Sequence, residues 1–415
     1  MKYLKVLFFF GVVACTGKDL PPDTDTDTET DTDTDTDTDT DTDTDTDTDT
    51  DTDTDTDTDT DSHWQGVDGF IVEKMTSAHI PGMAVAVTRP GEILWTGAFG
   101  LADVNASRRV TVDTPFMLAS VSKTVTGVAV MKATEDDLLS LDDELNSLLP
   151  FTVDNPLVAD ETIELRHLVT HTSGIQDNWS NMPYSEGDPT VALGAYLEGY
   201  LVPGGAWYNA TDNFYDYLPG EGSDYGNIAT ALAGYAVEVQ SKTPFDDYCE
   251  QHVFDVLGME NTGWHLEDFD VSTLAMPYEY VGGDYASYGH YGYADYPDGQ
   301  LRSSVSDMAR FLAAVSNEGE IEEARVLSAL TVDQMFTAPM PAVHEGQFVF
   351  WYESTVSGRA VIGHNGSDQG VATQMVFTPD TGIGVIVMMN VDWDSSVSDA
   401  AADIQTLLFE RAEAL

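Results

Sequence analysis

Apolar and polar positions divide the chain into three stretches of different character. Residues 6–13 form a short apolar run, residues 23–61 alternate strictly between an acidic residue and threonine, and regular apolar periodicity begins near residue 64. The alternating stretch has no apolar side chain to bury, and its charges repel one another, so it cannot form a core. The pattern predicts a disordered acidic linker over residues 15–62 and a folded body over residues 63–415.

Two kinds of periodicity inside the body predict its helices and strands. Apolar residues at helical spacing predict helices, and β-branched or aromatic runs bounded by glycine and proline predict strands. The predicted helices cover residues 67–77, 120–134, 162–171, 225–239, 243–257, 301–317, 331–335 and 395–414. The predicted strands cover residues 81–89, 92–99, 347–353, 360–363, 373–378 and 382–389.

The order of these elements predicts an α+β fold. Strands come from both ends of the body, whereas helical patterns and loops fill the middle from about residue 145 to residue 298. Segregated strands and helices of this kind build an antiparallel sheet with helices packed on it. We therefore expect one antiparallel sheet built from both ends, flanked by terminal helices, with an inserted helical lobe.

The charge of the chain narrows its range of partners. The formal net charge is −57, and from His63 onward there are 13 Lys and Arg against 52 Asp and Glu. A body this acidic repels phosphate backbones, so we expect no nucleic-acid partner. The Asp-x-Asp spacing of the linker also occurs in calcium loops, but the turn glycine and closing Glu of such loops are absent from it.

The first residues predict export. Lys2 and Lys5 precede an apolar run that is far shorter than the roughly 20 residues of a membrane-spanning helix. Residues 12–15, Val-Val-Ala-Cys, resemble a bacterial lipobox, in which the cysteine is lipidated. The resemblance implies a signal peptide over residues 1–14 and an outer-membrane lipid anchor on Cys15, on the periplasmic or the cell-surface face. An ordinary signal peptide followed by an incidental cysteine is the alternative.

One helix start carries residues suited to nucleophilic catalysis. Ser120 and Lys123 are three positions apart, and such positions share one face of a helix. A hydroxyl beside an amine is the arrangement that an activated serine nucleophile requires. The pattern is common by itself, since an N-capping serine and a surface lysine also produce it. Two later stretches supply further polar groups: Tyr225-Gly226-Asn227 ahead of an apolar helix, and His364-Asn365-Gly366 between two strands.

Ser-x-x-Lys, Tyr-x-Asn and His-x-Gly occur here in the order typical of one known family. Over roughly residues 64–412 the chain resembles the serine β-lactamase-related family, which includes class C β-lactamases, D-Ala-D-Ala carboxypeptidases and esterases. The resemblance implies the β-lactamase/transpeptidase-like fold and an acyl-enzyme mechanism without a cofactor.

The resemblance also assigns roles to individual residues. Ser120 is the expected nucleophile, and either Lys123 or Tyr225 is its general base. Asn227 is suited to hold a substrate amide or Lys123, because its side chain both donates and accepts. The backbone N–H groups of Ser120 and Ser367 are expected to form the oxyanion hole. The substrate-binding group of the third motif then comprises His364, Asn365, Gly366 and Ser367, where Gly366 allows close approach to the strand.

The third motif departs from the pattern of β-lactamases. His364 stands where β-lactamases and many carboxypeptidases have lysine, and Asn365 stands where threonine is frequent. A lysine offers a fixed positive charge to a substrate carboxylate, whereas a neutral histidine offers only a hydrogen bond. We therefore expect cleavage of esters or amides in small molecules or peptides. The alternatives are a D-Ala-D-Ala carboxypeptidase or β-lactamase, and a non-catalytic peptidoglycan-binding or sensor protein; the oligomeric state is not indicated.

Two other groupings have simpler interpretations. His167 and His171 have a metal-ligand spacing, but Leu168 stands where a metalloprotease base would be, so no metal site is expected. The tyrosines between residues 278 and 296 line a cleft mouth or pack on the surface.

Overall fold

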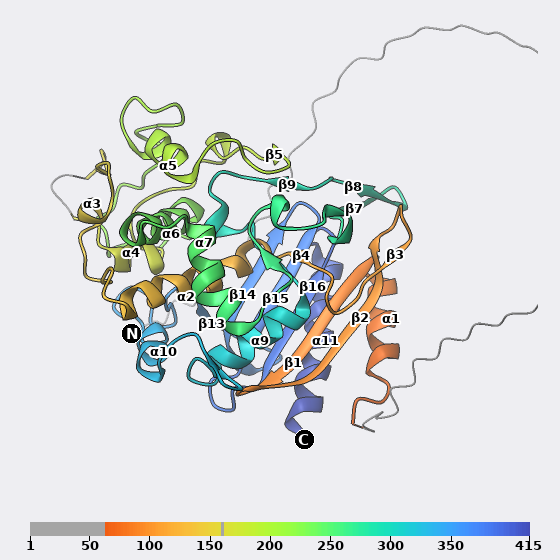
Figure 1. The fold of residues 1–415 in the computed structure, drawn as a ribbon. Helices are drawn as coiled ribbons and strands as arrows, with labels where there is room; N and C mark the ends of the chain where they lie inside the picture. Colours follow the sequence, from red (N-terminus) through yellow and green to blue (C-terminus); the bar gives the residue numbers. More distant parts are fainter. Residues whose placement is uncertain (1–62, 159–161) are drawn as a thin grey trace, which may run out of the picture. The chain divides into compact units, whose positions relative to one another are not determined.

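The computed structural model describes residues 63–158 and 162–415 (Figure 1). The predictions for the signal peptide, for Cys15 and for the acidic linker concern residues outside this range. No helix among the described residues is both long enough and apolar enough to cross a membrane.

A seven-stranded antiparallel sheet forms the centre of the body, in the order β13-β14-β15-β16-β1-β2-β3. Its strands are β1 (Gly82–Arg89), β2 (Glu92–Asp103), β3 (Arg108–Arg109), β13 (Tyr352–Val356), β14 (Arg359–Asp368), β15 (Val371–Phe377) and β16 (Gly384–Met389). The two ends of the body meet where β1 pairs with β16, with Val85 opposite Val387. Figure 1 shows this join as orange strands beside blue ones. The predicted α+β class with one antiparallel sheet is confirmed.

Alternating side chains of the sheet enter two separate cores. Val85 and Val87 of β1 pack with the terminal helices α1 (Val67–Ser77) and α11 (Ser395–Glu413). Ala84 and Ala86 face the opposite side, toward the larger core that contains α2 (Ser122–Glu135) and α9 (Val305–Val315). This alternation follows from the two-residue period of a strand.

Helices gather on the α2 side of the sheet. They are α3 (Leu145–Leu148), α4 (Leu165–Val169), α5 (Leu193–Leu201), α6 (Asn227–Ser241), α7 (Phe245–Cys249), α8 (Asp255–Leu257) and α10 (Ala329–Met335). Helix α2 packs against α6, α7, α10 and β14, so it is buried almost all round. Figure 1 shows α2 between the sheet and the green helices. Helix α2, which follows Ser120, is therefore held both by the sheet and by the helices that cover it.

Several predicted elements differ in the structure: the helix predicted over residues 162–171 covers only Leu165–Val169, and the strand predicted over residues 360–363 extends to Asp368. The helix predicted over residues 301–317 begins only at Val305, because Arg302–Ser303 form β10 between β4 (Phe116–Met117) and β6 (Thr262–Gly263). The helix predicted over residues 243–257 is interrupted by a π-helical turn at Glu250–Phe254. The strand predicted over residues 347–353 is wrong for most of its length, since the pairing begins at Tyr352 and Phe350 has a positive φ of 58°.

Candidate active site

Ser120 lies in a short 3₁₀ turn, Ala119–Val121, immediately before α2. The turn is held on both sides: Leu118 N donates to Leu301 O at 2.8 Å, and Thr373 Oγ1 of β15 donates to Leu118 O at 2.6 Å. Ala119 has a φ of 48°, a left-handed conformation that L-residues rarely adopt. Strained backbone of this kind persists only where its surroundings enforce it, which is common at functional sites.

Lys123 is completely buried and has three oxygen neighbours. Its Nζ lies 3.2 Å from Ser120 Oγ, 2.7 Å from Asn227 Oδ1 and 2.6 Å from the carbonyl oxygen of Asp298. The carboxylate of Asp298 is 3.8 Å away. The structure thus places the predicted nucleophile beside the predicted amine, and joins both to the second motif through Asn227.

Tyr225 and Asn227 stand at the N-terminal end of α6. The Tyr225 ring centroid is 4.9 Å from Lys123 Nζ, and 37% of the residue is exposed. The carboxylate of Asp177 caps the helix, since it accepts from Asn227 N at 2.8 Å and from Ile228 N at 3.0 Å. A carboxylate at this end of a helix is also favoured by the helix dipole. Asp177 therefore fixes the residue that contacts Lys123.

His171 supports the ring of Tyr225 from behind. The two ring centroids are 4.7 Å apart, and His171 Nδ1 accepts from Gly226 N at 3.2 Å. Burial lowers the pKa of His171 well below its usual value, and Lys123 acts in the same direction. His171 is therefore a neutral packing partner of the second motif. Within the described residues, no group of three or more His, Cys, Asp and Glu side chains could hold a metal ion.

The third motif lies on β14 against the turn that carries Ser120. A Cβ atom added to Gly366 would be 2.3 Å from Leu118 O and 3.1 Å from Ser120 N. Glycine is therefore required for β14 to approach the nucleophile turn itself, and not only for access of a substrate. The neighbouring Ser367 is exposed, and Asn365 contacts Tyr352 of β13 through its side chain and its backbone N–H.

Burial dominates the electrostatics of the site. It lowers the pKa of Lys123, although Asp298, Asp177, Asp295 and Asp368 act in the opposite direction. It raises the pKa of Tyr225 well above its usual range, against the hydrogen bond with Ser120. Both shifts favour neutral forms, because a buried charge loses its hydration.

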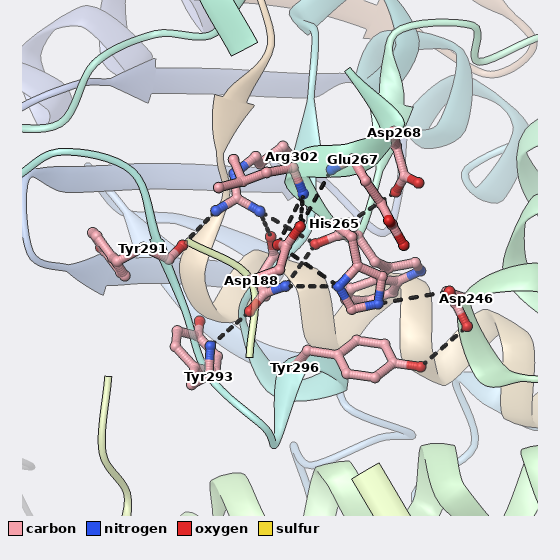
Figure 2. A network of polar contacts seen from close by, with 12 residues as sticks. Asp188, Asp246, His265, Glu267, Asp268, Tyr291, Tyr293, Tyr296 and Arg302 are labelled. Carbon is pink, nitrogen blue, oxygen red and sulfur yellow. Dashed lines mark hydrogen bonds and ion pairs between the residues drawn. The ribbon is translucent and has the colours of Figure 1, made fainter. Parts of the chain in front are cut away.

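Figure 2 shows a second polar network, which includes Arg302 of β10, the strand that pairs with β4 (Phe116–Met117) just ahead of Ser120. His265 stands between Asp188 at 3.8 Å and Asp246 at 3.6 Å. Asp188 also accepts from Leu266 N at 2.8 Å, and buried Arg302 donates to the carbonyl oxygen of Tyr291. The segment around residues 184–188 is held in two ways. Asp188 belongs to the network, and β5 (Ser185–Glu186) pairs with β9 (Tyr291–Gly292). This segment carries Tyr184, whose hydroxyl donates to Asp368 Oδ1 at 2.7 Å.

The structure brings together the residues of all three sequence motifs. Three contributors were missed: Asp177, Asp298 and His171. Asp177 lies in a loop and Asp298 ends a short 3₁₀ turn (Tyr296–Asp298), and neither stretch has a sequence pattern that signals these contacts. His171 was visible as part of a histidine pair, but its role depends on contact with Tyr225, which is distant in sequence. Part of the tyrosine-rich stretch lies near the site, since the Tyr291 hydroxyl donates to the carbonyl oxygen of Gln369, next to Asp368, at 2.7 Å.

The family model described as Beta-lactamase matches residues 67–408. The chain belongs to the β-lactamase family. It is 23% identical over 354 residues to a β-lactamase of Yersinia enterocolitica, covering 78% of this chain and 85% of that protein. It is 21% identical over 340 residues to Protein flp of Staphylococcus aureus strain MW2, covering 79% of this chain but only 63% of the length of Protein flp.

Solved structures show the β-lactamase-type fold at low sequence identity. The D-amino acid amidase from Ochrobactrum anthropi SV3 complexed with L-phenylalanine amide superposes with a TM-score of 0.67 at 20% identity, covering 84% of this chain and 99% of that one. EstCE1, a hydrolase with promiscuous acyltransferase activity, superposes with a TM-score of 0.65 at 20% identity, covering 84% and 98%. The β-lactamase-type fold of this chain is thus shared with a hydrolase and with a D-amino acid amidase.

Proposed function

We propose that this member of the β-lactamase family is a serine hydrolase that forms an acyl-enzyme on Ser120 and cleaves ester or amide bonds. The observation that carries the proposal is the hydrogen bonding of Lys123. A neutral amine has two N–H groups and one lone pair, and the two shortest contacts are to carbonyl oxygens, which only accept. The lone pair is then left for the hydroxyl proton of Ser120 at 3.2 Å.

The reaction steps follow from this arrangement. Lys123 takes the hydroxyl proton as Ser120 Oγ bonds to the substrate carbonyl carbon. The oxyanion accepts hydrogen bonds from the backbone N–H groups of Ser120 and Ser367, each worth about 3 to 4 kcal/mol. Tyr225 gives its proton to the departing oxygen or nitrogen and is reprotonated by Lys123. Water then hydrolyses the acyl-enzyme by the reverse proton transfers.

The third motif favours esters and amides over β-lactams. Burial lowers the pKa of His364 to about 3, with Lys123 acting in the same direction, so the side chain carries no charge for a β-lactam carboxylate. The amidase and esterase superpositions support this choice of substrate class. A D-Ala-D-Ala carboxypeptidase or β-lactamase is the second candidate, supported by the match to the Yersinia enterocolitica protein. A non-catalytic peptidoglycan sensor would not require the Ser120–Lys123 contact.

Labelling with a fluorophosphonate probe tests the serine hydrolase. Wild-type protein should be labelled and Ser120→Ala should not. Ser122→Ala is the matched control, because Ser122 Oγ is buried and has no hydrogen-bond partner among the described residues. Equal labelling of wild type and Ser120→Ala would contradict the proposal. Rates on a short-chain nitrophenyl ester, a chromogenic cephalosporin and a D-Ala-D-Ala peptide then rank the substrate classes, and the ester should be fastest.

We also propose that the protein is exported and anchored in the outer membrane through a lipid on Cys15. The support is the lipobox-like sequence of residues 12–15. Wild-type protein should fractionate with outer membranes, and Cys15→Ser should be released from them. A Cys15→Ser protein that remains in the membrane fraction would exclude the lipid anchor.

A further inference from the structure

The part of β14 that borders Ser120 has one open edge. The pairing of β13 with β14 ends where Tyr352 faces Gly363, whereas the pairing with β15 continues to Asp368. From His364 to Asp368, β14 is therefore paired with β15 alone among the described strands. An open strand edge can bind an extended ligand through its backbone groups. A substrate positioned for attack by Ser120 would lie along this edge.

His364 and Asp368 stand at the two ends of the open edge. Alternate residues of a strand share a face, so both side chains lie on the face of Gly366, which contacts the Ser120 turn. They are separated along the strand by about 13 Å. The His364 ring is 6.0 Å from the ring of Tyr225, the proposed proton donor to the leaving group. His364 therefore borders the leaving group, and Asp368 borders the acyl group.

His364 presents a hydrogen-bond acceptor where lysine would present a cation. Its Nδ1 lies 2.6 Å from the carbonyl oxygen of Asn365, and a carbonyl only accepts, so Nδ1 carries the proton. In the neutral ring Nε2 is then an unprotonated acceptor. Nε2 is buried and meets no partner among the described residues, and the residue is 3% exposed. His364 therefore offers a carboxylate on the leaving group neither a positive charge nor an N–H donor.

The carboxyl group of Asp368 stands at the opposite end, and that of Asp298 lies 3.8 Å from Lys123 Nζ. Asp368 Oδ1 accepts from Tyr184, and buried Asp298 Oδ1 has no hydrogen-bond partner in the described part of the chain. Burial raises the pKa of both carboxyl groups, and Lys123 opposes this rise at Asp298. A positive charge brought by a ligand would stabilise their ionised forms. The rings of Tyr184 and Tyr293, with centroids 5.8 Å apart, add faces that attract cations.

We propose that the site selects aminoacyl esters and amides: substrates with a free ammonium group on the acyl side, held at Asp368, and no carboxylate on the leaving group beside His364. The inference rests on the proposed serine hydrolase activity and names its substrate class. A lysine in the third motif would favour a substrate carboxylate. Neutral His364 does not favour one, and Asp368 favours a positive charge instead.

Protection from fluorophosphonate labelling tests the selection without requiring turnover. The ligands are alaninamide, N-acetylalaninamide and N-succinylalaninamide at pH 7, each as the D and the L form. Alaninamide should protect Ser120 at a concentration at least tenfold lower than the other two. At the other end, alanylglycinamide should protect at least tenfold better than alanylglycine. Equal protection within either comparison, or no protection by any ligand, overturns the proposal.

Two isosteric variants separate a local contact from the general acidity of the protein. Asp368→Asn should reduce the tenfold preference for alaninamide to about twofold or less. Asp380→Asn removes the same charge from an exposed turn at the far end of β15 and should retain the preference. A preference that survives in Asp368→Asn, or falls equally in both variants, would show that Asp368 does not bind the ammonium group of the ligand. If Asp368→Asn fails to fold, the wild-type comparisons still decide. Absence of labelling in the wild-type protein without any ligand would instead reject the proposed serine hydrolase itself.

Discussion

The carboxylate of Asp177 accepts a hydrogen bond from the backbone N–H of Asn227 at 2.8 Å, and Asn227 in turn accepts from Lys123 at 2.7 Å. A loop residue thus caps a helix and fixes the partner of the proposed base. Replacement of a capping side chain by alanine costs about 1 kcal/mol of stability. We expect Asp177→Ala to lose about this much in urea unfolding and also to label more slowly with a fluorophosphonate.

Asp394→Ala is the matched control for Asp177→Ala. Asp394 caps α11 by accepting from Ser396 N and Val397 N, on the face of the sheet away from α2. The control should lose similar stability but keep the wild-type labelling rate per folded molecule. If both variants label at the same rate, Asp177 acts only on stability.

The pH dependence of acylation distinguishes Lys123 from Tyr225 as the base. Because burial lowers the pKa of Lys123, its reactive neutral form should persist to a pH below 10.5. The labelling rate should rise with pH and level off below that value. Tyr225→Phe should retain this rise of the labelling rate with pH. Its rate of cleavage of substrates whose leaving group needs a proton should fall by a factor of about 10² to 10⁴. Lys123→Met should abolish the rise, and its persistence would exclude Lys123 as base.

Gly366→Ala tests the contact between β14 and the nucleophile turn. The added Cβ would meet Leu118 O at 2.3 Å, so the strand must shift, at a cost of about 1 to 3 kcal/mol. We expect lower stability and strongly reduced labelling. Gly69→Ala is the control, since a Cβ there meets nothing within 4 Å and the residue lies inside α1. It should stabilise the protein by about 1 kcal/mol and leave labelling unchanged.

Protonation of His265 should contribute to stability at mildly acidic pH. Burial lowers its pKa, but Asp188, Asp246 and Asp268 outweigh burial, and the net pKa is raised above 6.5. The folded protein then binds the proton more tightly than the unfolded chain. This stabilisation is complete below about pH 6.5, and it is lost as the pH rises through the folded-state pKa.

Thermal unfolding between pH 5 and pH 9 measures the contribution of His265. Its replacement in His265→Gln should lower the melting temperature more at pH 5 than at pH 9. Asp380→Asn serves as the control for a change of charge outside the network. An equal loss at both pH values in His265→Gln would show that only packing is affected.

The sequence predicted the sheet better than it predicted the site. Strands β1 and β16 are nearly continuous apolar segments and β15 is largely apolar, with turn residues at their ends, so the local pattern was sufficient. Residues 348–351 are also apolar and buried, but they form no strand: Phe350 has a positive φ, and the only bridge of this stretch among the described residues joins Gln347 to Tyr352. A local sequence pattern predicts burial, but it does not predict which buried segment pairs with another strand.

The motif residues were predictable because their spacing along the chain reflects shared elements. The contacts of Asp177 and Asp298 were not, because each depends on a loop that returns from a distant part of the chain. The same holds for the tenfold selection proposed at Asp368, which depends on tyrosines from two other segments. Helix α5 was missed as well, since Gly194 and Gly199 obscure its helical pattern.

The contacts of the Ser120 turn with β14 and β15 have a consequence for the newly synthesised chain. Ser120 leaves the ribosome long before β14 and β15, yet its turn is held by Thr373 and packs against Gly366. Contacts this distant in sequence form late and slowly. A nascent chain therefore carries Ser120, the proposed nucleophile, without the strand that completes the candidate site, and we expect it to be inactive until nearly all of the body has been made.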